Sequence, residues 1–153
     1  MRLTFGPRGI LQIDDARIIY RNFSGVGSKF NRKGDKNFSI IIDTRELADK
    51  LVEQGWNVKI RETSEDKEPF IHLPVKVKFN DRGPNVYLQS GHNRIKLDEE
   101  SISCLDNVDI INVDLDIRPY DWEVNGKTGR TAYLYSMCVT QEIDRFADRF
   151  DEE

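Results

Sequence analysis

Residues 109–140 decide the fold class, and they read DIINVDLDIRPYDWEVNGKTGRTAYLYSMCVT. Apolar and polar residues alternate from Asp109 to Arg118, which is the period-two pattern of a half-buried strand. An Asn-Gly pair follows at 125–126, so we expect Arg118–Val124 and Thr131–Thr140 to form a β-hairpin. The alternation directs four apolar side chains toward the core, namely Ile111, Val113, Leu115 and Ile117.

Strand-like segments also precede this stretch. Residues Ile71–Phe79 alternate most clearly, and Ile10–Ile13, Arg17–Phe23, Asn37–Asp43, Val58–Arg61 and Val86–Gln89 are shorter candidates. About eight short strands separated by Gly- and Asn-containing turns predict a mainly β protein with short helices. An OB-like Greek-key β-barrel (the oligonucleotide/oligosaccharide-binding type) is the leading arrangement, and a β-sandwich is the alternative.

Two internal segments have helical features. Thr44 can cap a central helix over Arg45–Gln54, which Gly55 would end. A second short helix is expected over Asp98–Leu105. The apolar residues expected to face the core are Leu47, Leu51 and Val52 in the first helix, and Ile102 and Leu105 in the second.

Length and composition limit the class of protein. The chain has 153 residues and a net charge of −4, which fits one globular domain of ordinary size. No apolar run approaches the ~18 residues of a membrane-spanning helix. Cys104 and Cys138 are isolated, which suits a reducing compartment rather than a disulfide scaffold or a zinc site. We therefore expect a protein of the bacterial cytoplasm that does not enter membranes.

The charges are distributed unevenly along the chain. Arg17–Lys36 holds six cations and one acid, whereas Asp98–Asp121 holds eight acids and one arginine. Such asymmetry points to contact with a polyanion at the basic segment. The acidic stretch leaves a second reading open, in which the protein binds another protein through its acidic surface, as a DNA mimic or a host-factor ligand.

Catalytic motifs are absent from the local sequence. The two histidines, His72 and His92, are not placed in any recognisable nucleophile arrangement, and Gly25–Lys29 lacks the spacing of a phosphate-binding loop. Asp114 and Asp116 share a strand face, but so do exposed acids on most strands. We therefore expect no enzyme activity, no metal and no cofactor.

Cations and aromatic residues are interleaved in two regions, and this combination is typical of proteins that bind single-stranded nucleic acid. Cations follow the phosphates while aromatic faces stack on bases, each stack contributing about 1–3 kcal/mol. The first region is the basic segment, and the second is the hairpin with a neighbouring strand. The candidate DNA-binding residues are Arg21, Lys29, Phe30, Arg32, Lys33, Lys36, Lys76, Lys78, Arg118, Tyr120, Trp122, Lys127, Arg130, Tyr133 and Tyr135.

Several stretches resemble a family of bacteriophage proteins. They are RNFSG at 21–25, KNFSI at 36–40, GWNVK at 55–59 and RPYDWEVNGK at 118–127, followed by AYL at 132–134 and SM at 136–137. The similarity extends from about Arg17 to Glu142. It implies an OB fold and non-catalytic, largely sequence-independent binding of single-stranded DNA in phage replication and recombination.

We expect an OB-like domain over residues 1–142 and an acidic tail over 143–153. Single-stranded DNA-binding proteins commonly use acidic, apolar-containing C-terminal segments to recruit replication or recombination proteins. Phe146 and Phe150 would be the partner-binding residues of this tail. The alternative is a final helix that docks on the barrel through Ile143, Phe146 and Phe150. Exposed strand edges also permit self-association into a homo-oligomer.

Overall fold

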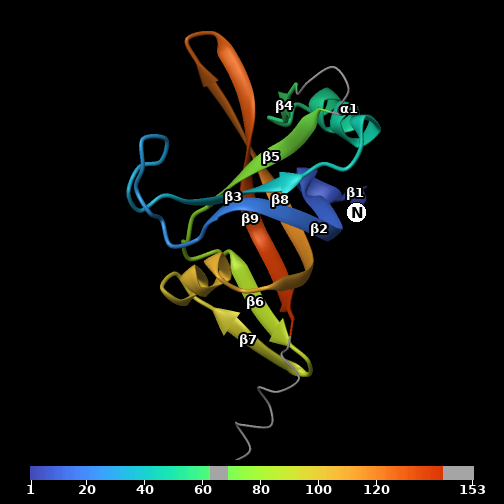
Figure 1. The fold of residues 1–153 in the computed structure, drawn as a ribbon. Coiled ribbons are helices and arrows are strands. Elements are labelled where there is room, and N and C mark those ends of the chain that lie inside the picture. Colours follow the sequence, from blue (N-terminus) through green and yellow to red (C-terminus); the bar gives the residue numbers. More distant parts are fainter. Residues whose placement is uncertain (63–68, 143–153) are drawn as a thin grey trace, which may run out of the picture.

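The computed structural model describes residues 1–62 and 69–142, and its centre is a closed β-barrel (Figure 1). Five strands form the barrel in the order β5-β3-β2-β8-β9, and parallel pairing of β9 with β5 closes it. They are β2 (Leu11–Asn22), β3 (Lys36–Ile41), β5 (Phe70–Val77), β8 (Ile110–Val124) and β9 (Lys127–Gln141). This topology confirms the OB-like barrel and excludes the sandwich.

Four further strands extend the sheet beyond the barrel. β1 (Arg2–Phe5) pairs with β2, and β4 (Lys59–Arg61) pairs with β5. β6 (Asn85–Ser90) runs parallel to β9, and β7 (Asn93–Leu97) pairs with β6 at the edge. Neither β1 nor β7 was expected, because both are short and mostly exposed and each offers only two alternating apolar residues.

The core fills the barrel with side chains from the alternating strands. Val113, Leu115 and Ile117 are buried as predicted. Ile111 was wrongly expected to be buried and is 61% exposed. The cause is a register shift between β8 and β9 at Ile110/Asn112, which interrupts the alternation just before the regular part of the strand.

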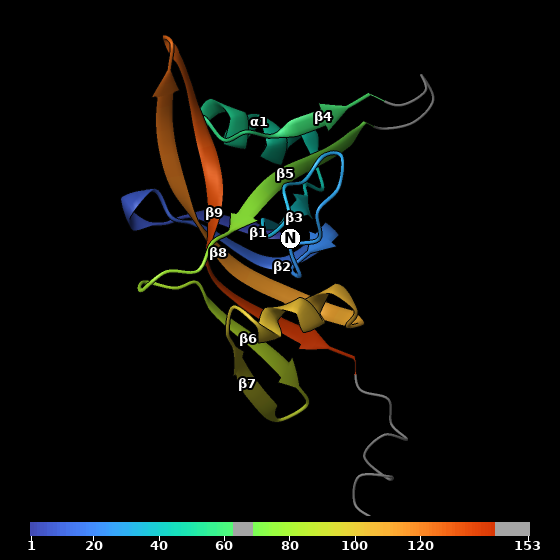
Figure 2. The same ribbon diagram turned by 90° about the vertical axis from the view of Figure 1, so that its left-hand side faces the viewer.

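The predicted central helix is α1 (Arg45–Glu53), which lies above β5 beside the β8–β9 hairpin (Figure 2). The Thr44 hydroxyl accepts a hydrogen bond from the Leu47 backbone N–H at 3.2 Å, which caps the first turn. Ala48 and Leu51 are buried, whereas Val52 is 52% exposed, contrary to expectation. Val52 lies one helical step, about 100°, away from Leu51 and therefore faces outward.

Two short 3₁₀ helices complete the secondary structure of residues 1–62 and 69–142. η1 (Pro7–Gly9) joins β1 to β2. η2 (Ser101–Asp106) replaces the second predicted helix and buries Ile102 and Leu105, as expected. No helix in the described ranges is long and apolar enough to cross a membrane.

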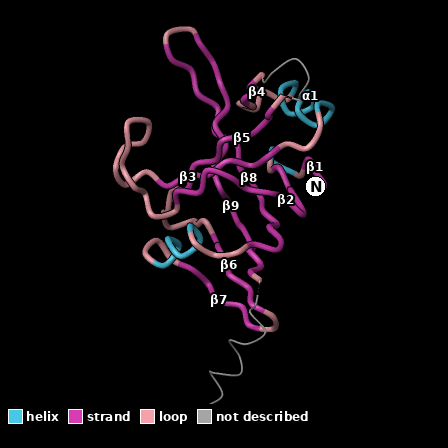
Figure 3. The backbone as a smooth tube through the Cα atoms, in the orientation of Figure 1, coloured by secondary structure: helices cyan, strands magenta, loops and turns pink. Residues whose placement is uncertain are grey.

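Two segments project from the barrel. The far half of the β8–β9 hairpin extends beyond it as a two-stranded arm, with pairing that continues to Val124 and Lys127 (Figure 2). Residues 23–35, between β2 and β3, form a long loop without strands or helices (Figure 3). We call these segments the arm (residues 118–133) and the basic loop (residues 23–35).

Candidate nucleic-acid interface

A groove of about 710 Å³ lies between the basic loop and the outer face of β3 and β5. Six of the candidate DNA-binding residues line it: Phe30, Arg32, Lys36, Lys76, Lys78 and Tyr133. They come from the basic loop, β3, β5 and the residue that follows it, and β9, so the fold brings together residues up to 103 positions apart in the sequence.

Strand register explains why these side chains share one face. Asn37 on β3 is the direct partner of Lys76 on β5, and Lys76 is the partner of Tyr133 on β9. Tyr133 is in turn the partner of Arg118 on β8. Directly paired residues project to the same side of a sheet, so Asn37, Lys76, Tyr133 and Arg118 form one row across four strands.

The aromatic residues of the arm continue from this row. The guanidinium of Arg118 lies 4.8 Å from the centre of the Tyr133 ring, and the Tyr120 ring meets Tyr133 edge-on at 5.9 Å. Tyr120 is 54% exposed although it packs against Tyr133. The cation and the neighbouring ring restrain Tyr133, so its ring is ordered without being buried in the core.

Trp122 lies farther out on the same face of the arm. Its indole covers Gly129, the cross-strand partner, where a Cβ atom would overlap the six-membered part of the ring. The indole N–H also donates a hydrogen bond to the Thr131 hydroxyl at 3.2 Å. Glycine at this position therefore allows the indole to lie flat on the arm while 38% of the residue remains exposed.

The basic loop is ordered by its own hydrogen bonds. The Asn31 side chain donates to the backbone carbonyls of Val26 and Asp35, at 2.9 and 3.0 Å, and accepts from the Asn37 amide at 2.8 Å. Gly25 has a φ of 73° and packs directly on Gly34, which brings the two ends of the loop together. This framework holds Phe30 at the tip, where it is 92% exposed.

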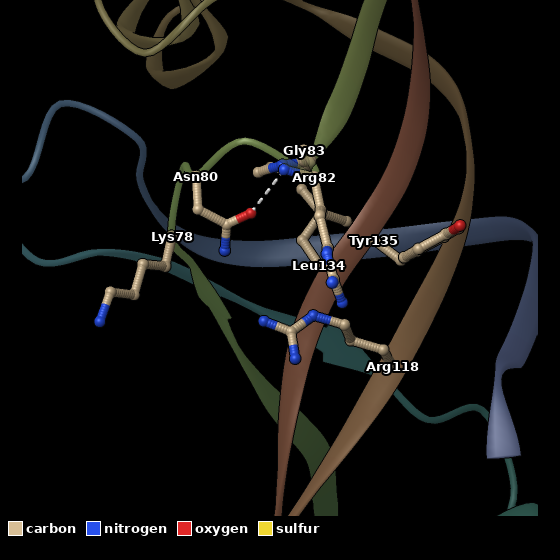
Figure 4. A pocket seen from close by; sticks show the side chains of 8 residues that line it. Lys78, Asn80, Arg82, Gly83, Arg118, Leu134 and Tyr135 are labelled. Carbon is tan, nitrogen blue, oxygen red and sulfur yellow. Dashed lines mark hydrogen bonds between the residues drawn. The ribbon is translucent and has the colours of Figure 1, made fainter. Parts of the chain in front are cut away.

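A second hollow of about 310 Å³ adjoins the groove through Lys78. Arg82 and Arg118 extend into it, and Tyr135 lies at its far side (Figure 4). The Arg82 backbone N–H donates to the Asn80 side chain at 2.9 Å, which shapes the turn that carries this arginine. The groove and this hollow together present six cations: Arg32, Lys36, Lys76, Lys78, Arg82 and Arg118.

The electrostatics of the groove differ from those of the remaining surface. Ion pairs in the described part of the chain engage the N-terminal amine, Arg2, Arg17, Arg45, Lys50 and Arg130, and none engages a groove cation. Asp35 and Glu99 are the acids that line the groove. The six cations therefore have charge available for an external anion.

The structure places two candidate cations away from this face. Arg21 donates to the backbone carbonyls of Leu105 and Val108, at 2.9 and 2.8 Å, and so fixes η2 against β2. Arg130 lies on the opposite face of the arm, where it pairs with Asp121 at 2.7 Å and covers the Trp56 ring at 5.4 Å. The hydrogen bonds from Arg130 lower the pKa of Asp121. Both arginines have structural partners that their sequence context did not reveal.

The remaining candidates are peripheral or undescribed. Lys29 and Lys33 are exposed on the basic loop outside the groove lining, and Lys127 is at the tip of the arm. Lys127 is six residues from Tyr133, which is about 20 Å along a strand. Phe146 and Phe150 lie outside the described residues, so their role stays a prediction.

Asn37 was not predicted as a groove residue, because its uncharged side chain does not match the combination of cations and aromatic residues that marked the other candidates. Among the described residues, no three His, Cys, Asp or Glu side chains converge as a metal site would require. Asp114 instead accepts a hydrogen bond from the Asp15 backbone N–H at 2.9 Å.

The amino-acid sequence also matches a known protein family. The sequence profile described as "Putative phage ssDNA-binding domain" matches residues 4–152. The chain belongs to this family. The family resemblance and the single-stranded DNA-binding function predicted from sequence are thereby confirmed. No curated protein sequence matches the chain.

Solved structures support the fold assignment. The chain is similar to the single-stranded DNA-binding protein from bacteriophage Enc34 in complex with ssDNA, at 12% identity and a TM-score of 0.61. That match covers 94% of this chain and 93% of the other. A second structure of the Enc34 protein gives 14% identity and a TM-score of 0.56, and covers 99% and 100% of the two chains. At these identities the similarity establishes the barrel fold.

Proposed function

We propose that the groove and the adjoining hollow bind single-stranded DNA without catalysis and largely without sequence preference. The row formed by Asn37, Lys76, Tyr133 and Arg118 carries this proposal, because it places a base-stacking ring between two cations on an open sheet face. A single strand can lay a base on Tyr133 and its phosphates against Lys76 and Arg118.

The shape of the site explains the expected preference for single strands. Phe30 and Tyr133 line opposite parts of one groove, one on the basic loop and one on the sheet. Bases must be unpaired and splayed out to stack on such rings, whereas duplex DNA keeps its bases stacked inside the helix. The family to which the chain belongs supports this assignment. We place the activity in phage DNA replication and recombination within the host cytoplasm.

Fluorescence-anisotropy titration of labelled oligo-dT, duplex DNA and RNA of equal length tests the proposal. We expect tight binding to oligo-dT and much weaker binding to the duplex. Tyr133→Ala should weaken oligo-dT binding by about 1–3 kcal/mol, or about 5- to 150-fold in Kd, while Tyr133→Phe should retain most of it. Absence of binding to oligo-dT at low salt would refute the proposal, and the acidic surface would then be the interface to examine.

A further inference from the structure

A second aromatic cluster lies on the same face of the sheet, outside the groove. The Tyr20 ring on β2 meets the rings of His72 and Phe70 on β5 edge-on, at 5.7 and 6.3 Å. The Phe70 and His72 rings are 5.2 Å apart. Tyr20 is 56% exposed, so the cluster presents a ring to solvent and is no part of the barrel core.

An irregularity in β2 exposes Tyr20. Strict alternation would direct Tyr20 to the same face as Ile18, which packs against the core. The pairing of β2 with β3 shifts between Ile19 and Asn22, and Tyr20 has a φ of 55°. A bulky residue in the left-handed region is strained by about 1–3 kcal/mol, and such strain is concentrated at functional sites. Here the left-handed backbone conformation directs the Tyr20 ring outward.

The ring then reaches across the intervening strand. Ser39 on β3 lies between β2 and β5, and its hydroxyl is 3.0 Å from His72 Nδ1. Ser39 is only 5% exposed because this cluster covers it. Desolvation and the nearby Lys59 charge lower the pKa of His72, which favours a neutral imidazole in the cluster at neutral pH.

Two cations flank the cluster on the neighbouring strand. On β4, Lys59 is the direct partner of His72, and Arg61 is the direct partner of Phe70. Both β4 residues are exposed, and neither pairs with a carboxylate of the described residues. Exposed cations beside aromatic rings, as found in the groove, thus occur a second time.

The cluster continues directly from the groove. Ser39 and Pro74 line the groove end, and His72 is two residues beyond Pro74 on the same face of β5. The spacing from Lys76 to His72 is four residues, or about 13 Å along the strand. No break in the register of β3 and β5 separates the two regions.

We propose that Tyr20, Phe70 and His72 form a second base-stacking site, with Lys59 and Arg61 as its phosphate contacts. The bound strand would leave the groove at Pro74 and follow β5 toward β4. This inference rests on the proposed function, because it extends the same DNA path. It predicts that the second site is occupied only when the oligonucleotide is long enough to span both regions.

Length-dependent binding tests the second site. Oligo-dT of about 4 to 16 nucleotides, the range of site sizes in OB folds, is titrated against wild type, Tyr20→Ala, Tyr20→Phe and Tyr133→Ala. Tyr20→Ala should weaken binding about 5- to 150-fold on the longest oligonucleotides and not on the shortest that bind. Tyr20→Phe should resemble wild type, and Tyr133→Ala should weaken binding at every length.

A second measurement does not depend on a substitution. Oligo-dT that contains 5-iodouracil is photocrosslinked to the wild-type protein, and the adducts are mapped by mass spectrometry. Adducts at Tyr20, Phe70 or His72 on long oligonucleotides support the inference.

The second site and the proposed function can be refuted separately. If wild type binds oligo-dT but Tyr20→Ala matches it at every length and adducts are confined to the groove, the second site is refuted and the proposed function stands. If wild type binds no oligo-dT, both are refuted.

Discussion

Salt dependence gives the most quantitative test of the groove. Six cations line the groove and the adjoining hollow. Each phosphate neutralised on a single strand contributes about −0.7 to the slope of log K against log salt. If all six contact phosphates, the slope is about −4, and affinity falls about 300-fold between roughly 50 and 200 mM salt.

Removing two of these charges should change the slope by a defined amount. Lys76 and Lys78 are both exposed, and neither has an ion-pair partner among the described residues. The double variant Lys76→Ala/Lys78→Ala should therefore reduce the magnitude of the slope by about 1.4. Anisotropy titrations of labelled oligo-dT at four or more salt concentrations measure this slope directly.

A control variant distinguishes the contribution of the groove cations to the salt slope from the contribution of the total charge of the protein. The double variant Lys50→Ala/Lys96→Ala also removes two exposed cations, from α1 and β7, outside the groove and the hollow. It should leave the slope within error of the wild-type value. Equal losses of slope in the two double variants would refute a localised groove, because they would show that only total charge matters.

Three further predictions concern individual residues. Arg21→Ala should lower the free energy of unfolding by about 1.5–3 kcal/mol in urea titrations, because it removes charged hydrogen bonds to the Leu105 and Val108 carbonyls, and it should leave oligo-dT binding unchanged. Gly129→Ala should displace the Trp122 indole and shift its fluorescence emission to the red, because the new Cβ would overlap the ring. Buried Trp56 provides a constant background, and an unchanged emission spectrum would contradict the packing of Trp122 on Gly129. Folding lowers the pKa of His72 below 6.5, so the unfolded state binds the imidazole proton more readily than the folded state does. The stability that this group contributes is therefore present above pH 6.5 and is lost as the pH falls through the folded pKa. His72→Gln should remove that part of the decline, seen in urea titrations between about pH 7 and 5, and identical pH profiles would exclude the linkage.

Local sequence patterns were sufficient to predict a mainly β fold and its hairpin, but they left a barrel and a sandwich as alternatives that only the pairing of β9 with β5 decides. Alternation of apolar and polar residues distinguishes the buried from the exposed face of β5 and β8, because one face of each strand packs on a common core. The same patterns could not place Lys76 beside Tyr133, since that contact depends on a parallel pair of strands distant in the sequence. Grouping cations with aromatic residues nevertheless selected both, because the chemistry of the ligand is independent of the strand order.

The candidate residues that the structure places elsewhere have a common cause. Arg21 and Arg130 resembled free cations in the sequence. In the fold, the Leu105 and Val108 carbonyls engage Arg21, and the carboxylate of Asp121 engages Arg130. Such partners are set by tertiary pairing and have no local signature. Tyr20 was missed for a related reason, since alternation directs it inward and only the register shift in β2 turns it outward.

Closure of the barrel by β9 has a consequence for how the chain folds during synthesis. Of the described strands β9 is made last, yet it pairs with β5, β6 and β8. Until the ribosome has released it, β5 and β8 each have an unpaired edge, and such edges are templates for pairing with other chains. The barrel must therefore form late from distant contacts, which slows folding. A chain arrested before residue 127 would lack β9, and its open strand edges would favour aggregation.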